Sequence, residues 1–304
     1  MRYDKFKKLF IRELKKLIEE EGLDYEVSIE EVTKINTHLS AVLIKQKKNS
    51  DNVIQMPVFY IEHLHEEFNS GKGSIQGFVQ YFLTRFFYDM EQYKKLLKIK
   101  DFSKDDLLRR VFKVAINTEY NIDFLKELYC EKILDLSIIY RSIVNIDEES
   151  RKIMSIIITK EQMKKFDITE EDIKKAVHKH KHGNLGSVLN YDGKLAKSLH
   201  VDAYSLTTKY DSFGSTFLID LDILKEKADN FADDLVIIPI SADKLYIIKF
   251  SDIKDKPEKI DLLKMSLKEN NNYYKSINSK ENNDLFLSDN LYKYNRAEEN
   301  LSIF

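Results

Sequence analysis

The stretch from Leu235 to Phe250 reads LVIIPISADKLYIIKF. It contains two apolar runs rich in β-branched and aromatic residues, Leu235–Ile240 and Leu245–Phe250, separated by a small polar turn. Such runs are too short for ordinary helices, and the turn between them predicts a β-hairpin buried on at least one face. Helical patterns flank it at Leu221–Phe231 and Glu258–Leu267. The stretch therefore predicts an α+β fold, with mixed or antiparallel sheets packed against amphipathic helices.

The composition argues against several classes of protein. The chain has 304 residues, enough for one large or two ordinary domains. Its 49 Lys and Arg are balanced by 51 Asp and Glu, so the overall charge makes no case for nucleic acid or anionic membrane. The single cysteine, Cys130, excludes an internal disulfide and suits a reducing cytosol. No apolar run is long enough to span a membrane, and we expect a cytoplasmic protein.

Two domains are predicted from the distribution of polar and apolar residues. The polar stretch Lys98–Lys104 separates residues 1–100 from residues 101–304. The first domain has an N-terminal helix, short strands and an aromatic helical pair, and the second is the larger α+β domain with the hairpin. Lys268–Asp284 has the composition of a loose linker. Apolar and aromatic residues return after it, so we expect the segment 285–304 to fold back onto the second domain.

In the first domain, apolar residues recur at spacings of three and four and predict an amphipathic helix at about Tyr3–Glu20, with Gly22 in the position that stops it. Alternation over Tyr25–Ile29 predicts a half-buried strand, although Ser28 and Glu31 also fit a capping box that would start a helix. Strands are predicted next at Leu39–Ile44 and Val53–Met56, and helices at Val58–Phe68 and Ser74–Leu97.

The last of these helices carries an aromatic stripe at helical spacing. A stripe of this kind can line a ligand pocket, but it is far more often a core-packing face, and we interpret it as core. Its members are Phe78, Phe82, Phe86, Met90 and Tyr93.

The second domain shows helix-start signals, β-branched runs and turns. Capping boxes predict helix starts at Ser103–Asp106, Thr159–Gln162 and Thr169–Asp172. Strands are predicted at Ile133–Val144 and Ile153–Ile158, a turn region at Gly183–Gly193, and a strand pair at Tyr204–Thr208 and Ser215–Ile219 around Asp211–Gly214.

The run His178-Lys-His180-Lys-His182 is the most tempting chemical motif. On a helix, His178 and His182 lie one turn apart and would form half of a zinc site. No further ligand pair completes such a site, and basic residues are favoured in the last turn of a helix because its carbonyls carry partial negative charge. We therefore predict no metal ligands here.

Three weaker motifs have structural interpretations. Gly71-Lys-Gly-Ser74 lacks the earlier glycine of a phosphate-binding loop, so Ser74 is interpreted as a helix N-cap. Asp220 and Asp222 could hold a divalent cation, but two carboxylates at a strand-to-helix junction more often cap the helix. Cys130 has no local signal of a reactive thiolate and is interpreted as structural. No cofactor loop is predicted.

The order of several segments resembles a family of uncharacterised Gram-positive bacterial proteins, classed as a domain of unknown function. The resemblance rests on Tyr60-Ile-Glu62 with Glu66-Glu67-Phe68 and Gly71, Ile133–Tyr140, Leu206-Thr207 with Gly214, Ile238–Ser241, and Leu287-Ser288-Asp289 with Tyr292, Tyr294 and Arg296. The chain departs from the family pattern at Phe166, where Trp is common, and at Ala242-Asp243, where His-Glu is frequent. The resemblance implies an α+β cytosolic protein and carries over no catalytic residues.

The sequence leads to three hypotheses about function. The first is a soluble, non-catalytic protein-interaction or regulatory protein with a protein partner, because no complete catalytic or cofactor motif is found. The second is a hydrolase-type enzyme whose site is assembled from dispersed residues such as His178, His182, Asp211 and Asp220. The third is a nucleic-acid-binding accessory protein, which requires a local basic face.

Overall fold

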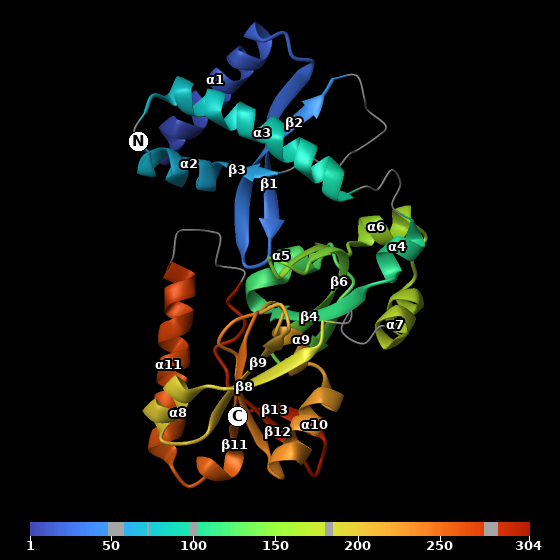
Figure 1. Ribbon diagram of the computed structural model, residues 1–304, viewed down its shortest axis with the longest axis vertical. Coiled ribbons are helices and arrows are strands. Elements are labelled where there is room, and N and C mark those ends of the chain that lie inside the picture. The colour runs from blue at the N-terminus through green and yellow to red at the C-terminus, as the bar shows by residue number, and fades with distance from the viewer. Residues whose placement is uncertain (48–57, 72, 98–102, 180–184, 277–284) are drawn as a thin grey trace. The chain divides into compact units, whose positions relative to one another are not determined.

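A computed structural model describes residues 1–47, 58–71, 73–97, 103–179, 185–276 and 285–304 (Figure 1). The described residues divide into two compact units, Met1–Leu97 and Ser103–Phe304, called unit 1 and unit 2 below. In both units every strand pair among these residues is antiparallel, and helices pack against the sheets. The predicted α+β fold is therefore confirmed. No helix in the described part of the chain combines the length and apolarity needed to cross a membrane.

Unit 1 combines a three-stranded sheet with three helices. Its two long strands form a hairpin that turns at Asn36, whose φ of 57° is left-handed. The strand predicted over Tyr25–Ile29 is present, and the alternative helix start at Ser28 is wrong. The elements are α1 (Tyr3–Glu20), β1 (Tyr25–Lys34), β2 (Thr37–Gln46), β3 (Phe59–Tyr60), α2 (Ile61–Ser70) and α3 (Ile75–Leu97).

The helix predicted at Val58–Phe68 begins later than expected. Phe59 and Tyr60 pair with β2 instead, and the helix starts at Ile61. The predicted strand Val53–Met56 lies outside the described residues.

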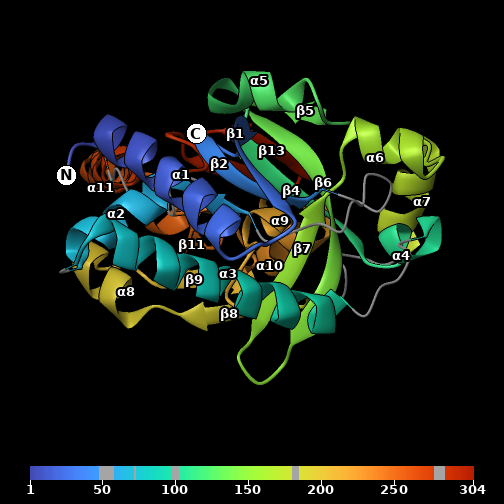
Figure 2. The same cartoon turned by 90° about the horizontal axis from the view of Figure 1, so that it is seen from above.

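The core of unit 1 is formed by α1, the sheet, α2 and α3, and α1 and α3 run side by side (Figure 2). Phe10 of α1 meets Phe82 of α3 edge to face, with ring centroids 5.1 Å apart. Phe86 and Met90 are buried in the same cluster, so the aromatic stripe is a core face as predicted. The side chain of Tyr93 lies outside the described part.

Unit 2 contains a six-stranded sheet with the predicted hairpin at its centre. Leu235 pairs with Lys249 and Ile238 with Tyr246, and the C-terminal strand β12 pairs with β10 on the other side. The strand order is β13-β12-β10-β11-β9-β8. The strands are β8 (Ser187–Tyr191), β9 (Ala203–Thr208), β10 (Leu235–Ile238), β11 (Leu245–Lys249), β12 (Tyr292–Asn295) and β13 (Asn300–Ile303).

A second, four-stranded sheet of unit 2 is built around the long strand β6. The predicted capping boxes are present at Ser103, Thr159 and Thr169. Three helices of unit 2, α4, α6 and α7, lie together on one side of this sheet's end of the unit (Figures 1 and 2). The elements are α4 (Lys104–Leu108), β4 (Val111–Asn117), η1 (Glu119–Asn121), α5 (Ile122–Leu125), β5 (Glu131–Ile133), β6 (Leu136–Asp147), β7 (Lys152–Ile157), α6 (Lys160–Lys165) and α7 (Glu170–Lys179).

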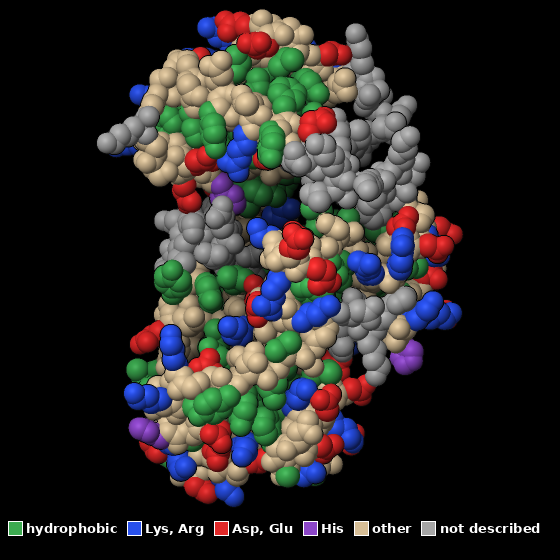
Figure 3. Space-filling view, viewed as in Figure 1, with side chains coloured by type: hydrophobic (Ala, Val, Ile, Leu, Met, Phe, Trp, Pro, Cys, Tyr) green, Lys and Arg blue, Asp and Glu red, His purple; other side chains and the backbone are tan. Residues whose placement is uncertain are grey.

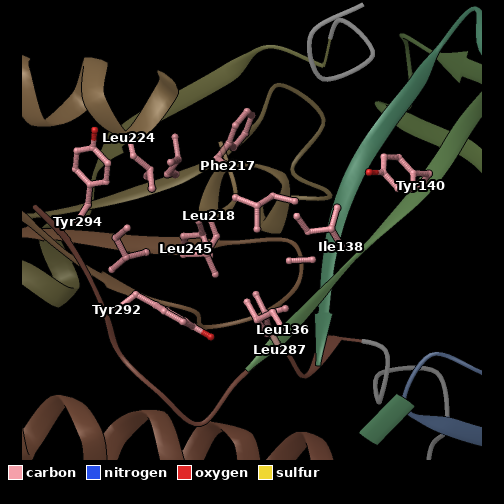
Figure 4. Close-up of a cluster of buried hydrophobic side chains, with 14 of the residues drawn as sticks. Leu136, Ile138, Tyr140, Phe217, Leu218, Leu224, Leu245, Leu287, Tyr292 and Tyr294 are labelled. Atoms are coloured by element: carbon pink, nitrogen blue, oxygen red, sulfur yellow. The ribbon is translucent and has the colours of Figure 1, made fainter. Parts of the chain in front are cut away.

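The main core of unit 2 joins the two sheets. Side chains from β6, β11, β12, α9 (Ser215–Leu218) and α10 (Leu221–Phe231) converge in one cluster with Leu287 of the C-terminal segment (Figure 4). The remaining helical elements are α8 (Gly193–Leu199), η3 (Phe250–Asp252) and α11 (Pro257–Ser276).

Three predictions for unit 2 are wrong. Ser215–Leu218 is a buried helix, not a strand, so β9 pairs with β8 and β11 instead. The predicted turn region Gly183–Gly193 contains the strand β8 at Ser187–Tyr191. Helix α11 continues to Ser276, through the first part of the expected linker.

A hydrogen-bonded cluster around Asp135 ties the C-terminal segment to the β5–β6 turn. The Asp135 carboxylate accepts hydrogen bonds from Ser288 Oγ at 2.6 Å, Tyr292 Oη at 2.8 Å and Asn290 Nδ2 at 3.0 Å. Several residues that carry the family resemblance therefore meet here, in a structural role.

Candidate functional site

A pocket of about 480 Å³ in unit 2 lies where β4, β5, β6, α7 and the start of α10 meet. We call it the α7–α10 pocket. Side chains from elements far apart in sequence line it, and most of them are polar or ionisable. The ionisable ones are Lys113, Glu131, Tyr140, Lys174, His178, Asp220 and Asp222.

Lys113 reaches the pocket from the middle of β4. It lies opposite Tyr140 in the β4–β6 register, so the two side chains share one face of the sheet. Its strand neighbours are buried, whereas Lys113 itself is half-buried. No ion pair to the Lys113 ammonium occurs among the described residues. Because a lysine in an otherwise buried strand needs a polar partner, this side chain is a candidate ligand-binding group.

Glu131 is held as a carboxylate by the residues around it. Its Oε1 accepts hydrogen bonds from the hydroxyls of Tyr129 and Tyr140, each at 3.0 Å, and lies 3.5 Å from Lys174 Nζ. Burial alone would raise the pKa of Glu131, but the two tyrosine hydroxyls and the lysine lower it below its usual range. The negative charge of this group is therefore already compensated.

The same contacts act on the tyrosines. Burial, followed by the charge of Glu131, raises the pKa of Tyr140, and burial also raises that of Tyr129. The two rings stack with centroids 5.3 Å apart and planes 7° apart, which fixes their orientation. Both hydroxyls therefore stay protonated near neutral pH and act as hydrogen-bond donors.

Asp220 and Asp222 provide the acidic side of the pocket. Asp220 Oδ1 accepts a hydrogen bond from the Ile223 N–H at 3.0 Å, so Asp220 is the N-cap of α10, as predicted. Asp222 follows in the first turn and is exposed. His178 lies in the last turn of α7 and lines the pocket from the other side. The pocket thus contains charges of both signs.

The structure brings together only part of the dispersed site predicted from the sequence. His178 and Asp220 line the same pocket. Asp211 does not line it, and its carboxylate pairs with Arg151 at 3.1 Å. His180 and His182 lie outside the described residues. Within the described part of the chain, no three His, Cys, Asp or Glu side chains are placed to hold a metal ion.

The remaining candidates have structural positions. Ser74 Oγ accepts a hydrogen bond from the Gly77 N–H at 3.2 Å at the start of α3, which is the predicted N-cap role, whereas Lys72 lies outside the described residues. Cys130 is a half-buried free thiol. On the face shown in Figure 3, Lys and Arg are interspersed with Asp and Glu and form no broad basic patch.

Sequence reasoning missed Lys113, Glu131, Tyr140 and Lys174. One signal was present, because Lys113 interrupts the otherwise apolar run VFKVAI and a lone charge in a buried strand needs an explanation. The others gave no signal, since only the fold brings β5, β6 and α7 together.

Comparison with known proteins identifies the family but no characterised relative. No curated protein and no solved structure matches the chain. A family of unknown function, DUF5688, matches residues 3–296, which is nearly the whole chain. The protein therefore belongs to the DUF5688 family.

Proposed function

We propose that this protein is a non-catalytic regulatory protein that binds a small zwitterionic ligand in the α7–α10 pocket. The observation that carries the proposal is Lys113, a half-buried strand lysine that lines the pocket without an ion-pair partner among the described residues. A ligand carboxylate would form the ion pair that no described residue forms with the Lys113 ammonium.

The rest of the lining favours a ligand with both charges over a simple anion. Asp222 and Asp220 also line the pocket, and their negative charge would repel a purely anionic ligand. Glu131 and Lys174 largely compensate each other. The volume of about 480 Å³ is in the lower part of the range for small-molecule sites, roughly 300–1,000 Å³. The chemistry therefore fits an amino acid or a very short peptide.

The contacts of the carboxylates support binding rather than catalysis. Glu131 is fixed by two tyrosine hydroxyls that lower its pKa, which makes it a poor proton donor. One oxygen of Asp220 is engaged in capping α10. A cytoplasmic location and a protein partner, through which binding would be relayed, are part of the proposal, and the lone Cys130 is compatible with a reducing compartment.

Thermal unfolding with defined small molecules tests the proposal. An equimolar mixture of the twenty common amino acids is compared with succinate, which has only negative charge, and putrescine, which has only positive charge. A ligand at 100 times its Kd stabilises by about 2.7 kcal/mol, which raises the Tm of a unit of this size by roughly 5–10 °C. We expect amino acids to give the largest shift.

Lys113→Met and Lys249→Met form a matched pair of variants. Both lysines are half-buried on strands, but only Lys113 lines the pocket. Lys113→Met is expected to abolish the ligand-induced shift and to keep or raise the Tm of the free protein, because it places an apolar side chain in an otherwise buried strand. Lys249→Met should leave the shift intact. Equal shifts in both variants, or no shift with any compound, would refute the proposal.

A hydrolase is the second candidate, favoured by the presence of His178 and Asp220 in one pocket. Incubation with p-nitrophenyl acetate and with amino-acid p-nitroanilides tests it. Turnover that His178→Ala abolishes, while the ligand-induced shift in Tm remains, would replace the binding proposal with the enzymatic one.

A further inference from the structure

Helix α11 carries apolar side chains on two sides, and only one side packs inside unit 2. The inner face packs into a cluster with β10 and β11 through Ile260, Leu263 and Leu267. Near the end of the helix, Asn271 is buried and donates a hydrogen bond from Nδ2 to the Ser288 carbonyl oxygen at 2.8 Å. The helix lies along the flank of unit 2 (Figure 1). These apolar contacts and the Asn271 hydrogen bond hold α11 against the rest of unit 2.

The outer face carries three large apolar side chains that are exposed in the described structure. Leu262, Met265 and Tyr273 are 43%, 59% and 62% exposed. At 100° per residue the three lie on one side of the helix, opposite the inner face. Scattered single apolar residues are normal on a protein surface, but a row along one helix face is typical of a binding surface.

Acidic residues accompany this row. Glu258, Asp261 and Glu269 are exposed on the same side of α11, and none of them forms an ion pair with another described residue. Lys264 and Lys268 lie further round the helix. At 100° per residue these carboxylates lie among and beside the three apolar side chains, and this arrangement favours a partner with basic residues.

We propose that the outer face of α11 is a docking surface for an amphipathic helix of a partner protein, with an apolar stripe flanked by Lys or Arg. Such a helix would bury Leu262 and Met265 and would place its basic residues against Glu258, Asp261 and Glu269. A second copy of this chain fits poorly, because two α11 helices packed through this face would bring like charges together. The docking surface is separate from the α7–α10 pocket, and the two proposals stand independently.

Two synthetic peptides test the charge requirement on the full-length protein. Both are amphipathic helices of about 20 residues with leucine on one face. One carries lysine on the other face and its counterpart carries glutamate. Fluorescence anisotropy should show saturable binding of the leucine–lysine peptide, at least ten times tighter than that of the leucine–glutamate peptide and weaker at high salt.

Surface variants then locate the binding. Leu262→Gln with Met265→Gln should weaken binding of the leucine–lysine peptide at least tenfold, and so should the combination Glu258→Gln, Asp261→Asn and Glu269→Gln. Tyr191→Gln is the control, because Tyr191 is an equally exposed aromatic residue, 59% exposed, on β8. Circular dichroism checks that each variant is folded.

Three results would overturn the proposal. The first is equal binding of both peptides, and the second is binding that the α11 variants do not weaken. The third is a dimer of the free protein in sedimentation velocity that Leu262→Gln with Met265→Gln dissociates, because the occupant would then be a second copy of the chain.

Discussion

The protonation state of the Tyr3 phenol is coupled to the packing of unit 1. Its hydroxyl donates a hydrogen bond to Glu62 Oε1 at 2.8 Å and lies 3.2 Å from Ser40 Oγ. Glu62 is buried and also accepts the Ser40 N–H. Burial, together with the charge of Glu62, raises the pKa of Tyr3 from 10.0 to about 12. The neutral phenol is therefore part of the folded structure.

Replacing Tyr3 with Phe should have a pH-dependent effect on stability. Near pH 7 we expect a loss of about 1–2 kcal/mol, because a buried carboxylate loses a hydrogen-bond donor. The folded-state pKa of Tyr3 is raised, so the wild type retains this contribution below pH 10 and loses it as the pH rises from 10 towards 12. The gap between wild type and Tyr3→Phe should narrow by about 1 kcal/mol over that range, allowing for solvent screening.

Urea unfolding at pH 7, 10 and 11.5 measures this gap. Tyr88→Phe serves as the control, since Tyr88 is 63% exposed on α3, and it should change stability by less than about 0.5 kcal/mol at each pH. A gap that stays constant with pH would contradict the expected coupling between Tyr3 and Glu62.

Gly214 shows how two elements of unit 2 depend on a close backbone approach. It precedes α9, and its N–H donates to the Asp243 carbonyl oxygen of the β10–β11 turn at 3.1 Å. A Cβ at this position would lie 2.4 Å from that oxygen and 2.7 Å from the carbonyl carbon. Neither backbone atom can move without disturbing the central hairpin.

Gly214→Ala should therefore destabilise unit 2 by about 2–4 kcal/mol. Gly77→Ala in α3 is the matched control, because its Cβ would meet only Ser74 Oγ, at 3.5 Å. That variant should be neutral or more stable by up to about 1 kcal/mol, since alanine favours a helix over glycine. Chemical unfolding of both variants gives the comparison. If Gly214→Ala leaves the free energy of unfolding unchanged, the prediction is wrong, and the β10–β11 turn can shift to accept the added Cβ.

The elements that sequence predicted well are those with a strong periodic pattern. Helix α1 has an apolar stripe at helical spacing, and the β10–β11 hairpin has two apolar runs separated by a polar turn. Ser215–Leu218 gave no usable signal, because all four of its side chains are buried and neither alternation nor a helical stripe can appear. A short buried run fits a strand or a helix equally well.

Two other elements depend on contacts that are distant in sequence. Strand β8 has only a weak apolar pattern, and it is defined by its pairing with β9. Helix α11 continues through an Asn-rich segment because Asn271 is buried and bonded to the Ser288 carbonyl oxygen. The pocket was only partly predictable for the same reason, since Lys113 and Glu131 come to line one pocket through the pairing of β4 and β5 with β6.

At the scale of the whole molecule, each unit has a hydrophobic core of its own. In unit 1 the core is formed by residues of α1, the sheet, α2 and α3. In unit 2 it joins the two sheets and includes the C-terminal segment, and a second cluster lies under α11. The family match spans both units.

Separate cores predict that the full-length chain unfolds in two transitions, because a compact unit with its own core can fold cooperatively by itself. Differential scanning calorimetry of the wild type, Tyr3→Phe and Gly214→Ala tests this prediction. Tyr3→Phe should lower the midpoint of one transition, and Gly214→Ala that of the other, with the unaffected transition moving by less than about 1 °C. The α7–α10 pocket lies in unit 2, so a bound ligand should raise only the transition that Gly214→Ala lowers. If both variants instead shift one shared transition, the two units fold as a single cooperative structure, and ligand binding in unit 2 would stabilise the whole chain.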